Sequence, residues 1–162
     1  MCYRCTEPKF ANEIVSGLGS QLYGARWTPK GSFATVYLCE TAEAALQEYL
    51  ARGRRMKIPD HKALPMVMAA VTVKVGNLLD GTNAEVEKAV RIYLEGEKGH
   101  WRTVQGTREA VSQAIGRAVY ELKFSGLMVM SQALKGGRNV VLFPRNLQKG
   151  EVLSAPELSI GE

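Results

Sequence analysis

Three side chains with complementary chemistry follow one another closely within residues 22–50. Arg26 lies in an expected loop, Tyr37 in an expected strand and Glu48 in an expected helix. A guanidinium, a phenol and a carboxylate from successive elements can together bind a ligand that is anionic at one end and develops positive charge at the other. Cleavage of an N-glycosidic bond with a cationic leaving group has these demands. Nicotinamide leaves NAD as a neutral base, so the site needs no strong general acid and must stabilise an oxocarbenium-like ribose.

Several other catalytic sites lack the residues that they require. The chain has only two histidines, His61 and His100, both in expected loops, and contains neither G-x-S-x-G nor H-E-x-x-H. The C-x-x-C formed by Cys2 and Cys5 has no second pair to complete a zinc site, and it lies at the chain terminus rather than between a strand and a helix. We therefore expect no metal site and no cofactor, with NAD as a substrate.

The strand and the helix that carry Tyr37 and Glu48 are each predicted by a local pattern. Residues 33–39 alternate between two faces, which places Tyr37 opposite the aliphatic side chains. Thr41 is a candidate N-cap for the helix that follows.

Helical periodicity leaves the surroundings of Glu48 open. It places Glu48 opposite the apolar stripe, on the same face as Ala44 and Arg52. Taken alone, this spacing favours an exposed ion pair between Glu48 and Arg52. Periodicity cannot distinguish open solvent from the wall of a cleft, so a catalytic position is also compatible with it.

The hydrophobic pattern of the remaining residues predicts one α/β domain without internal repeats. We expect strands near Tyr3 and Arg4 and at 66–75, 127–130 and 139–143, and helices at 84–94 and 107–122, with one or two helical turns at 11–16. The apolar run 66–75 is typical of a central strand buried on both faces, and Thr107 is a candidate cap. His100 and Trp101 fall in a short link. We predict a domain over residues 1–147, followed by a frayed C-terminal tail at 148–162.

Composition and charge limit the cellular setting and the partners. The chain has 162 residues, is 46% hydrophobic and 23% charged, and lacks an apolar run of the roughly 20 residues that span a membrane. Three cysteines and no apparent secretion signal favour reduced thiols in the cytoplasm.

The net charge of +5 indicates an anionic partner. The basic run 52–57 lacks interleaved aromatic residues, so we do not expect direct nucleic-acid binding, although a non-catalytic module that binds through this run remains an alternative.

Longer stretches of the chain resemble the RES-domain family, which is named for an Arg, a Glu and a Ser. The stretches are LYGARWTPKG, VYLCETAEAALQEYL and GLMVMSQALKGGRNVVLF, in that order. The three family residues match Arg26, Glu48 and Ser131. The opening Tyr3 and Arg4 resemble the family's N-terminal strand, and VKVGNLLD resembles its middle strand. Three positions depart from the family pattern: Ala25 and Thr28 around the arginine, and Met130 before the serine.

The resemblance implies a fold related to ADP-ribosyltransferases and the role of a toxin in a bacterial toxin-antitoxin pair. Such toxins degrade NAD by hydrolysis or phosphorolysis, and some members instead ADP-ribosylate a protein. The expected partner is a helix-turn-helix (Xre-like) antitoxin that blocks the pocket. The oligomeric state stays open, a homodimer included.

The resemblance also implies roles for six residues. Glu48 would stabilise the ribosyl cation, and Arg4 and Arg26 would bind the phosphates or the nicotinamide side. Tyr37 would be an active-site phenol. Ser131 and Asn139 would form hydrogen bonds with the substrate.

Overall fold

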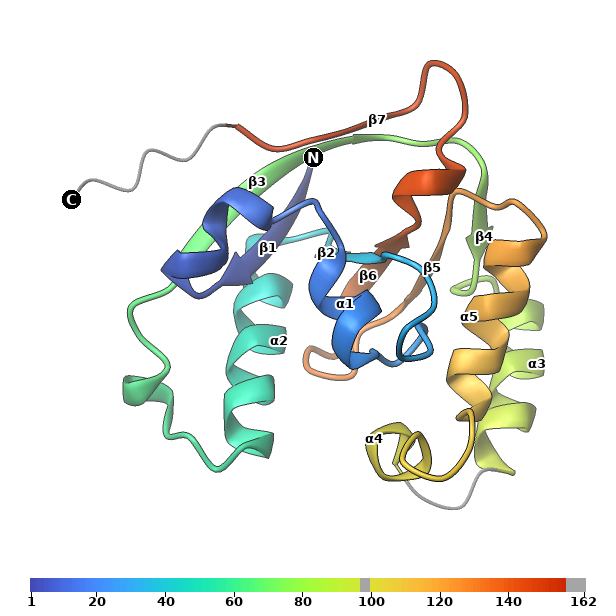
Figure 1. The fold of residues 1–162 in the computed structure, drawn as a ribbon, viewed down its shortest axis with the longest axis horizontal. Coiled ribbons are helices and arrows are strands. Elements are labelled where there is room, and N and C mark those ends of the chain that lie inside the picture. Colours follow the sequence, from blue (N-terminus) through green and yellow to red (C-terminus); the bar gives the residue numbers. More distant parts are fainter. Residues whose placement is uncertain (97–99, 157–162) are drawn as a thin grey trace.

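The computed structural model describes residues 1–96 and 100–156, which form a mixed α/β fold around one curled sheet (Figure 1). The described strands lie in the order β4-β5-β6-β2-β1-β3-β7. They are β1 (Cys2–Thr6), β2 (Val36–Cys39), β3 (Val67–Lys74), β4 (Leu78–Asp80), β5 (Gly126–Met130), β6 (Arg138–Leu142) and β7 (Val152–Ser154). The pair β4–β5 is parallel and the other pairs are antiparallel. No helix in the described part of the chain is long and apolar enough to cross a membrane.

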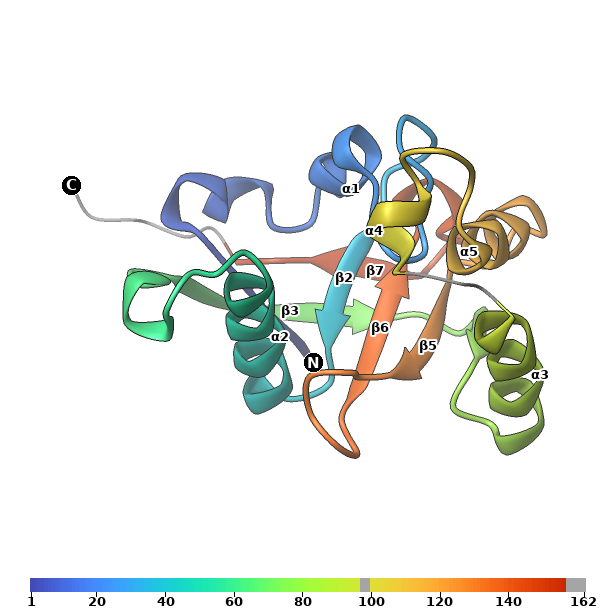
Figure 2. The same ribbon diagram turned by 90° about the horizontal axis from the view of Figure 1, so that it is seen from below.

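Helices cover the two halves of this sheet separately (Figure 2). The α-helices are α1 (Leu18–Tyr23), α2 (Ala42–Arg55), α3 (Ala84–Glu95), α4 (Trp101–Val104) and α5 (Val111–Glu121), and the 3₁₀ turns are η1 (Pro8–Glu13), η2 (Asp60–Lys62) and η3 (Pro144–Asn146). Helix α2 packs on β1, β2 and β3, whereas α5 packs on β5 with α3 and α4 beside it. The helices that bury this sheet are therefore divided between its two ends.

The two faces of the sheet have different cores. Alternate residues of β2, Val36 and Leu38, are fully buried in one core with Val71 and Leu142. The other face buries an aromatic cluster that includes Trp27, Phe33 and Phe143. Tyr37 lies on this second face, as the alternation of residues 33–39 predicts.

Two predictions about strands are wrong. Strand β3 is buried on one face only, and it lies next to β7 near the edge of the sheet rather than at its centre. Residues 152–154, expected to be part of a frayed tail, form the edge strand β7 against Thr72, Val73 and Lys74. Strand β7 pairs with the backbone edge of β3 and covers neither of its faces, and the side chains Met68, Ala70 and Thr72 on one face are exposed.

Several element boundaries also differ from the sequence-based predictions. Helix α5 begins at Val111 rather than after Thr107, and Gln113 accepts a hydrogen bond from the N–H of Ala110 at its start. The expected link at His100 and Trp101 is the short helix α4, which His100 caps. Helix α2 continues to Arg55, so the basic run lies partly within the helix.

Strands β1 and β2 separate beside the predicted site. Their ladder has the single register Tyr3↔Cys39, whereas β1 pairs with β3 over five residues and β2 pairs with β6 over four. Arg4 on β1 and Tyr37 on β2 follow and precede this pair, on the stretch where no ladder register joins the two strands.

Candidate active site

Helix α2 directs Glu48 toward the sheet. Thr41 caps the helix by accepting a hydrogen bond from the N–H of Ala44 at 3.1 Å. Ala44 and Ala45 are buried against Cys39 of β2, and the small side chains let the helix approach the sheet closely. Glu48 lies one turn after Ala44 on the same face, so it also points inward. The face that periodicity assigns to solvent is thus a packed face.

The Glu48 carboxylate is held by two donors from other elements. Its Oε1 accepts hydrogen bonds from Ser131 Oγ and from Asn139 Nδ2, each at 2.7 Å. Oε2 has no hydrogen-bond partner among the described residues. No ion pair joins Glu48 to Arg52 within this part of the chain, so the exposed pair suggested by their spacing is not formed.

Both donors to Glu48 are themselves oriented. Ser131 Oγ accepts hydrogen bonds from the backbone N–H groups of Ala133 and Leu134 at 3.1 and 3.2 Å, and these bonds fix the turn after β5. The amide oxygen of Asn139 accepts the thiol of Cys39 at 3.2 Å. Burial, with a smaller effect of the nearby Glu48 charge, raises the pKa of Cys39 to about 12, so the thiol keeps the proton that it donates. The carboxylate is therefore preorganised rather than free to rotate.

Tyr37 holds the loop that carries Arg26. Its hydroxyl accepts the backbone N–H of Trp27 at 3.0 Å and shares a hydrogen bond of 2.9 Å with Thr28 Oγ1. Burial raises the pKa of Tyr37 to about 12 despite these bonds, so the phenol is neutral at physiological pH. From the other side, Nε2 of Gln113 on α5 donates to the carbonyls of Ala25 and Thr28 at 3.0 and 3.2 Å. The loop is fixed by a strand and a helix together.

The two predicted phosphate ligands are both largely withdrawn from solvent, Arg4 on β1 and Arg26 in the loop before β2. Arg26 stacks on the Trp27 ring with its Cζ 5.2 Å from the ring centroid. Burial lowers the pKa of Arg26, and the Glu48 charge opposes this change. Arg4 donates from Nη1 to the carbonyl of Ile14 at 2.6 Å. Burial lowers the pKa of Arg4 too, and the positive charge of Arg52 lowers it further.

The structure thus brings the six predicted residues to one region in two connected groups. Glu48, Ser131 and Asn139 form a hydrogen-bonded group. Arg4, Arg26 and Tyr37 form the second through their charges, since both guanidinium groups lower the pKa of the Tyr37 phenol against the effect of burial. The two groups meet where the charges of Arg26 and Glu48 interact.

Sequence reasoning missed three contributors to this region: Thr28, Cys39 and Arg52. Thr28 and Cys39 orient Tyr37 and Asn139 through contacts that depend on the sheet register. Arg52 is exposed in the last turn of α2, and its positive charge also lowers the pKa of Arg4, an effect that the sequence does not reveal. The one sequence signal that Arg52 contributes to this region is its position four residues after Glu48, which places both side chains on the same face of the helix.

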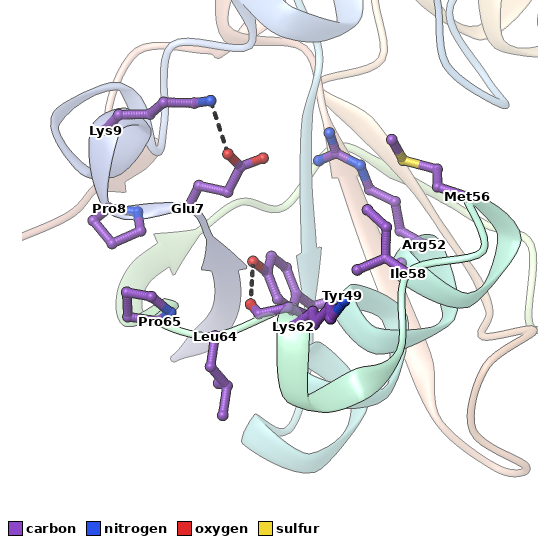
Figure 3. Close-up of a pocket in the computed structure, with 12 residues that line it drawn as sticks. Glu7, Pro8, Lys9, Tyr49, Arg52, Met56, Ile58, Lys62, Leu64 and Pro65 are labelled. Carbon is purple, nitrogen blue, oxygen red and sulfur yellow. Dashed lines mark hydrogen bonds and ion pairs between the residues drawn. The ribbon is translucent and has the colours of Figure 1, made fainter.

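A cavity of about 480 Å³ lies between the start of η1, helix α2 and the loop around η2 (Figure 3). Glu7 and Lys9 lie on one side of it and Arg52, Met56 and Ile58 on the other. None of the six predicted residues lines this cavity, and Arg52 connects the two places.

Comparison with known proteins identifies the family. The model of the RES domain matches residues 1–160. The chain belongs to the RES-domain family. The resemblance carried by the arginine, glutamate and serine motifs is therefore confirmed for nearly the whole sequence.

Two named relatives are similar at low identity. The NAD(+) phosphorylase MbcT of Mycobacterium tuberculosis and that of Mycobacterium bovis are each 28% identical over 130 residues, which cover 79% of this chain and 65% of the relative. The crystal structure of the M. tuberculosis MbcT-MbcA toxin-antitoxin complex matches with a TM-score of 0.74 and 22% identity, over 96% of this chain and 80% of that chain. This structural match supports the mixed α/β fold. The sequence alignment spans somewhat less than two thirds of the length of the curated relatives.

Proposed function

We propose that this RES-domain protein is the toxin of a bacterial toxin-antitoxin pair and cleaves NAD at the nicotinamide glycosidic bond. The observation that carries the proposal is the Glu48 carboxylate, which Ser131 and Asn139 hold through one oxygen while the other oxygen has no partner in the described chain. A fixed anion of this kind is suited to an oxocarbenium-like ribose.

The reaction balances without a general acid. The bond between ribose C1′ and the nicotinamide nitrogen breaks, and its electron pair leaves with nicotinamide, which becomes neutral. Positive charge develops on the ribose beside Glu48. Water or phosphate then forms the new bond at C1′, and water loses a proton in doing so. Arg4 and Arg26 bind the pyrophosphate, and Tyr37 keeps the Arg26 loop in place.

The relatives favour phosphate as the acceptor. MbcT is named an NAD(+) phosphorylase and is seen in complex with MbcA as a toxin with its antitoxin. By analogy with that complex, we expect an antitoxin as the partner of this chain; its helix-turn-helix type follows from the family resemblance, and the cytoplasm as location from the sequence composition. Transfer of ADP-ribose to a protein would use the same site with a different acceptor.

The decisive experiment follows nicotinamide and the ribosyl product by chromatography after NAD is incubated with the purified protein, with and without phosphate. A phosphorylated ADP-ribose product formed only with phosphate indicates phosphorolysis, and ADP-ribose in both buffers indicates hydrolysis. Label transferred from NAD to a protein indicates ADP-ribosylation. No loss of NAD under any of these conditions contradicts the proposal and favours a binding module.

The Glu48→Gln variant tests the role of the carboxylate. It keeps the shape and removes the charge, so we expect the rate of NAD cleavage to fall by about 100-fold or more. Glu43→Gln, an exposed position in the first turn of the same helix, is the matched control and should retain the parent rate. A Glu48→Gln protein as active as the parent would show that another group stabilises the ribosyl cation.

A further inference from the structure

The cavity in Figure 3 is lined by residues of α2 that follow Glu48 along the helix, Tyr49, Arg52 and Gly53. Along α2, Arg52 follows Glu48 by one turn and Met56 follows by two, which is roughly 12 Å along the helix axis. Arg52 lines the cavity, and its charge lowers the pKa of Arg4 on β1. Arg52 therefore links the cavity with the residues around Glu48 and Arg4, and a ligand that occupies both places would pass it.

The walls of the cavity suit a flat, largely apolar group. They include Tyr49, Met56, Ile58 and Pro65. The Tyr49 hydroxyl donates to the carbonyl of Ala63 at 2.9 Å, which fixes the ring while leaving its face available. Aromatic and aliphatic walls of this kind stack against nucleobases. The volume of about 480 Å³ lies within the roughly 300–1,000 Å³ typical of ligand pockets.

The charge at the mouth of the cavity is positive. Glu7, the one acidic residue of the lining, already pairs with Lys9 at 2.9 Å. Arg52 has no carboxylate partner within the described residues, although Arg54 on the same helix pairs with Asp60 at 2.6 Å. A guanidinium left without a carboxylate is available for a phosphate.

We propose that this cavity binds the adenosine half of the dinucleotide and that Arg52 binds the pyrophosphate between adenosine and the ribose at Glu48. The proposal rests on NAD cleavage as the proposed function and adds a substrate subsite to it. It assigns Met56 and Ile58 to the recognition of adenosine and leaves the chemical step to Glu48.

The test measures inhibition by ADP, which carries adenosine and pyrophosphate but no scissile bond. In the parent, ADP should compete with NAD. Met56→Ser and Ile58→Ser should each raise the inhibition constant of ADP and the KM for NAD by about tenfold, with kcat within twofold of the parent. Met68→Ser and Ile92→Ser, which alter exposed side chains outside the cavity, are the matched controls and should change neither constant.

A second measurement does not depend on the variants folding. An NAD analogue with a photoreactive azide on adenine should label the native protein within residues 7–9 or 49–65, which line the cavity. Labelling elsewhere, absence of competition by ADP, or unchanged constants in both cavity variants would overturn the adenosine subsite while leaving NAD cleavage intact. Failure of the parent to release nicotinamide would overturn the proposed function itself.

Discussion

The side chains that contact Glu48 are hydrogen-bond donors, which suit a carboxylate with one negative charge. Two donors converge on Oε1, and the thiol of Cys39 fixes the amide of Asn139 so that its N–H points to the carboxylate. Asn139 thus contributes a donor at a position where a second anion would be unfavourable, because like charges in contact repel strongly in a partly buried site.

Asn139→Asp tests this requirement with almost no change in shape. We expect the rate of NAD cleavage at neutral pH to fall by about 100-fold, because the new carboxylate replaces a donor and repels Glu48. Steady-state kinetics would measure the loss. The control is Asn83→Asp at the N-cap of α3, where aspartate caps equally well, so activity should be unchanged. Parent activity in Asn139→Asp would show that the donor to Glu48 is dispensable.

At the scale of single residues, the sequence predicts where the chemistry is and not how it is supported. Arg26, Tyr37 and Glu48 follow from their types and short separation, and Ser131 and Asn139 follow only from the family resemblance. Contacts across 83 and 91 residues, such as those from Ser131 and Asn139 to Glu48, depend on the order and register of β5 and β6. Local patterns carry no information about that register.

At the scale of elements, the loop that carries Arg26 is positioned by helix α5. Gly116 lies where the helix meets the loop, and a Cβ atom there would clash with the carbonyl oxygen of Trp27. The contact is with backbone on the loop side, so no flexible side chain could move to accommodate a methyl group.

Gly116→Ala should therefore destabilise the protein even though alanine favours helix formation. We expect a loss of about 1–3 kcal/mol from overpacking, and at least a tenfold fall in kcat/KM because the Arg26 loop is displaced. Gly19→Ala in α1, where a Cβ meets nothing within 4 Å, should leave activity unchanged and gain up to about 1 kcal/mol. Chemical denaturation and NAD kinetics would measure both effects. Equal behaviour of the two variants would contradict this role of Gly116.

The sequence predicts the helices and strands that have a strong local hydrophobic pattern. It does not predict the strands that form only because a neighbouring strand provides hydrogen-bond partners. The apolar stripes of α3 and α5 and the alternation in β2 are visible in the sequence. Strands β4 and β7 have three residues each and exist because β5 and β3 provide their hydrogen-bond partners. The apolar run of β3 resembles a central strand, but burial of one face alone results from its place beside the edge strand.

At the scale of the whole molecule, Glu151 joins segments that are far apart in the sequence. Its Oε1 accepts hydrogen bonds from the backbone N–H groups of Gly76 and Asn77 at 2.9 and 3.1 Å. Its Oε2 accepts hydrogen bonds from Ser125 Oγ at 2.6 Å and from the backbone N–H of Gln148 at 2.8 Å. The carboxylate thereby ties the segment before β7 to the β3–β4 link and to the start of β5.

These bonds give the stability of the fold a predictable dependence on pH. Desolvation alone would raise the pKa of Glu151, but the hydrogen bonds to its charged form outweigh it and lower the pKa from 4.5 to about 2. Because the pKa is lower in the folded state, the stabilisation is fully present above about pH 4.5 and is lost as the pH falls toward 2.

Glu151→Gln should remove this contribution. At pH 7 we expect a loss of about 1 kcal/mol, kept small because the carboxylate is partly exposed to solvent, and a Tm lower by about 2–4 °C. Near pH 2 the difference between variant and parent should shrink, since about half of the parent's Glu151 carboxyl is then protonated in the folded state and nearly all of it in the unfolded state. Thermal unfolding followed by circular dichroism at both pH values measures the two differences, with the exposed Glu95→Gln as control. A Tm difference that persists unchanged near pH 2 would mean that the substituted amide perturbs the packing of this segment, and that the charge of Glu151 is not what holds it.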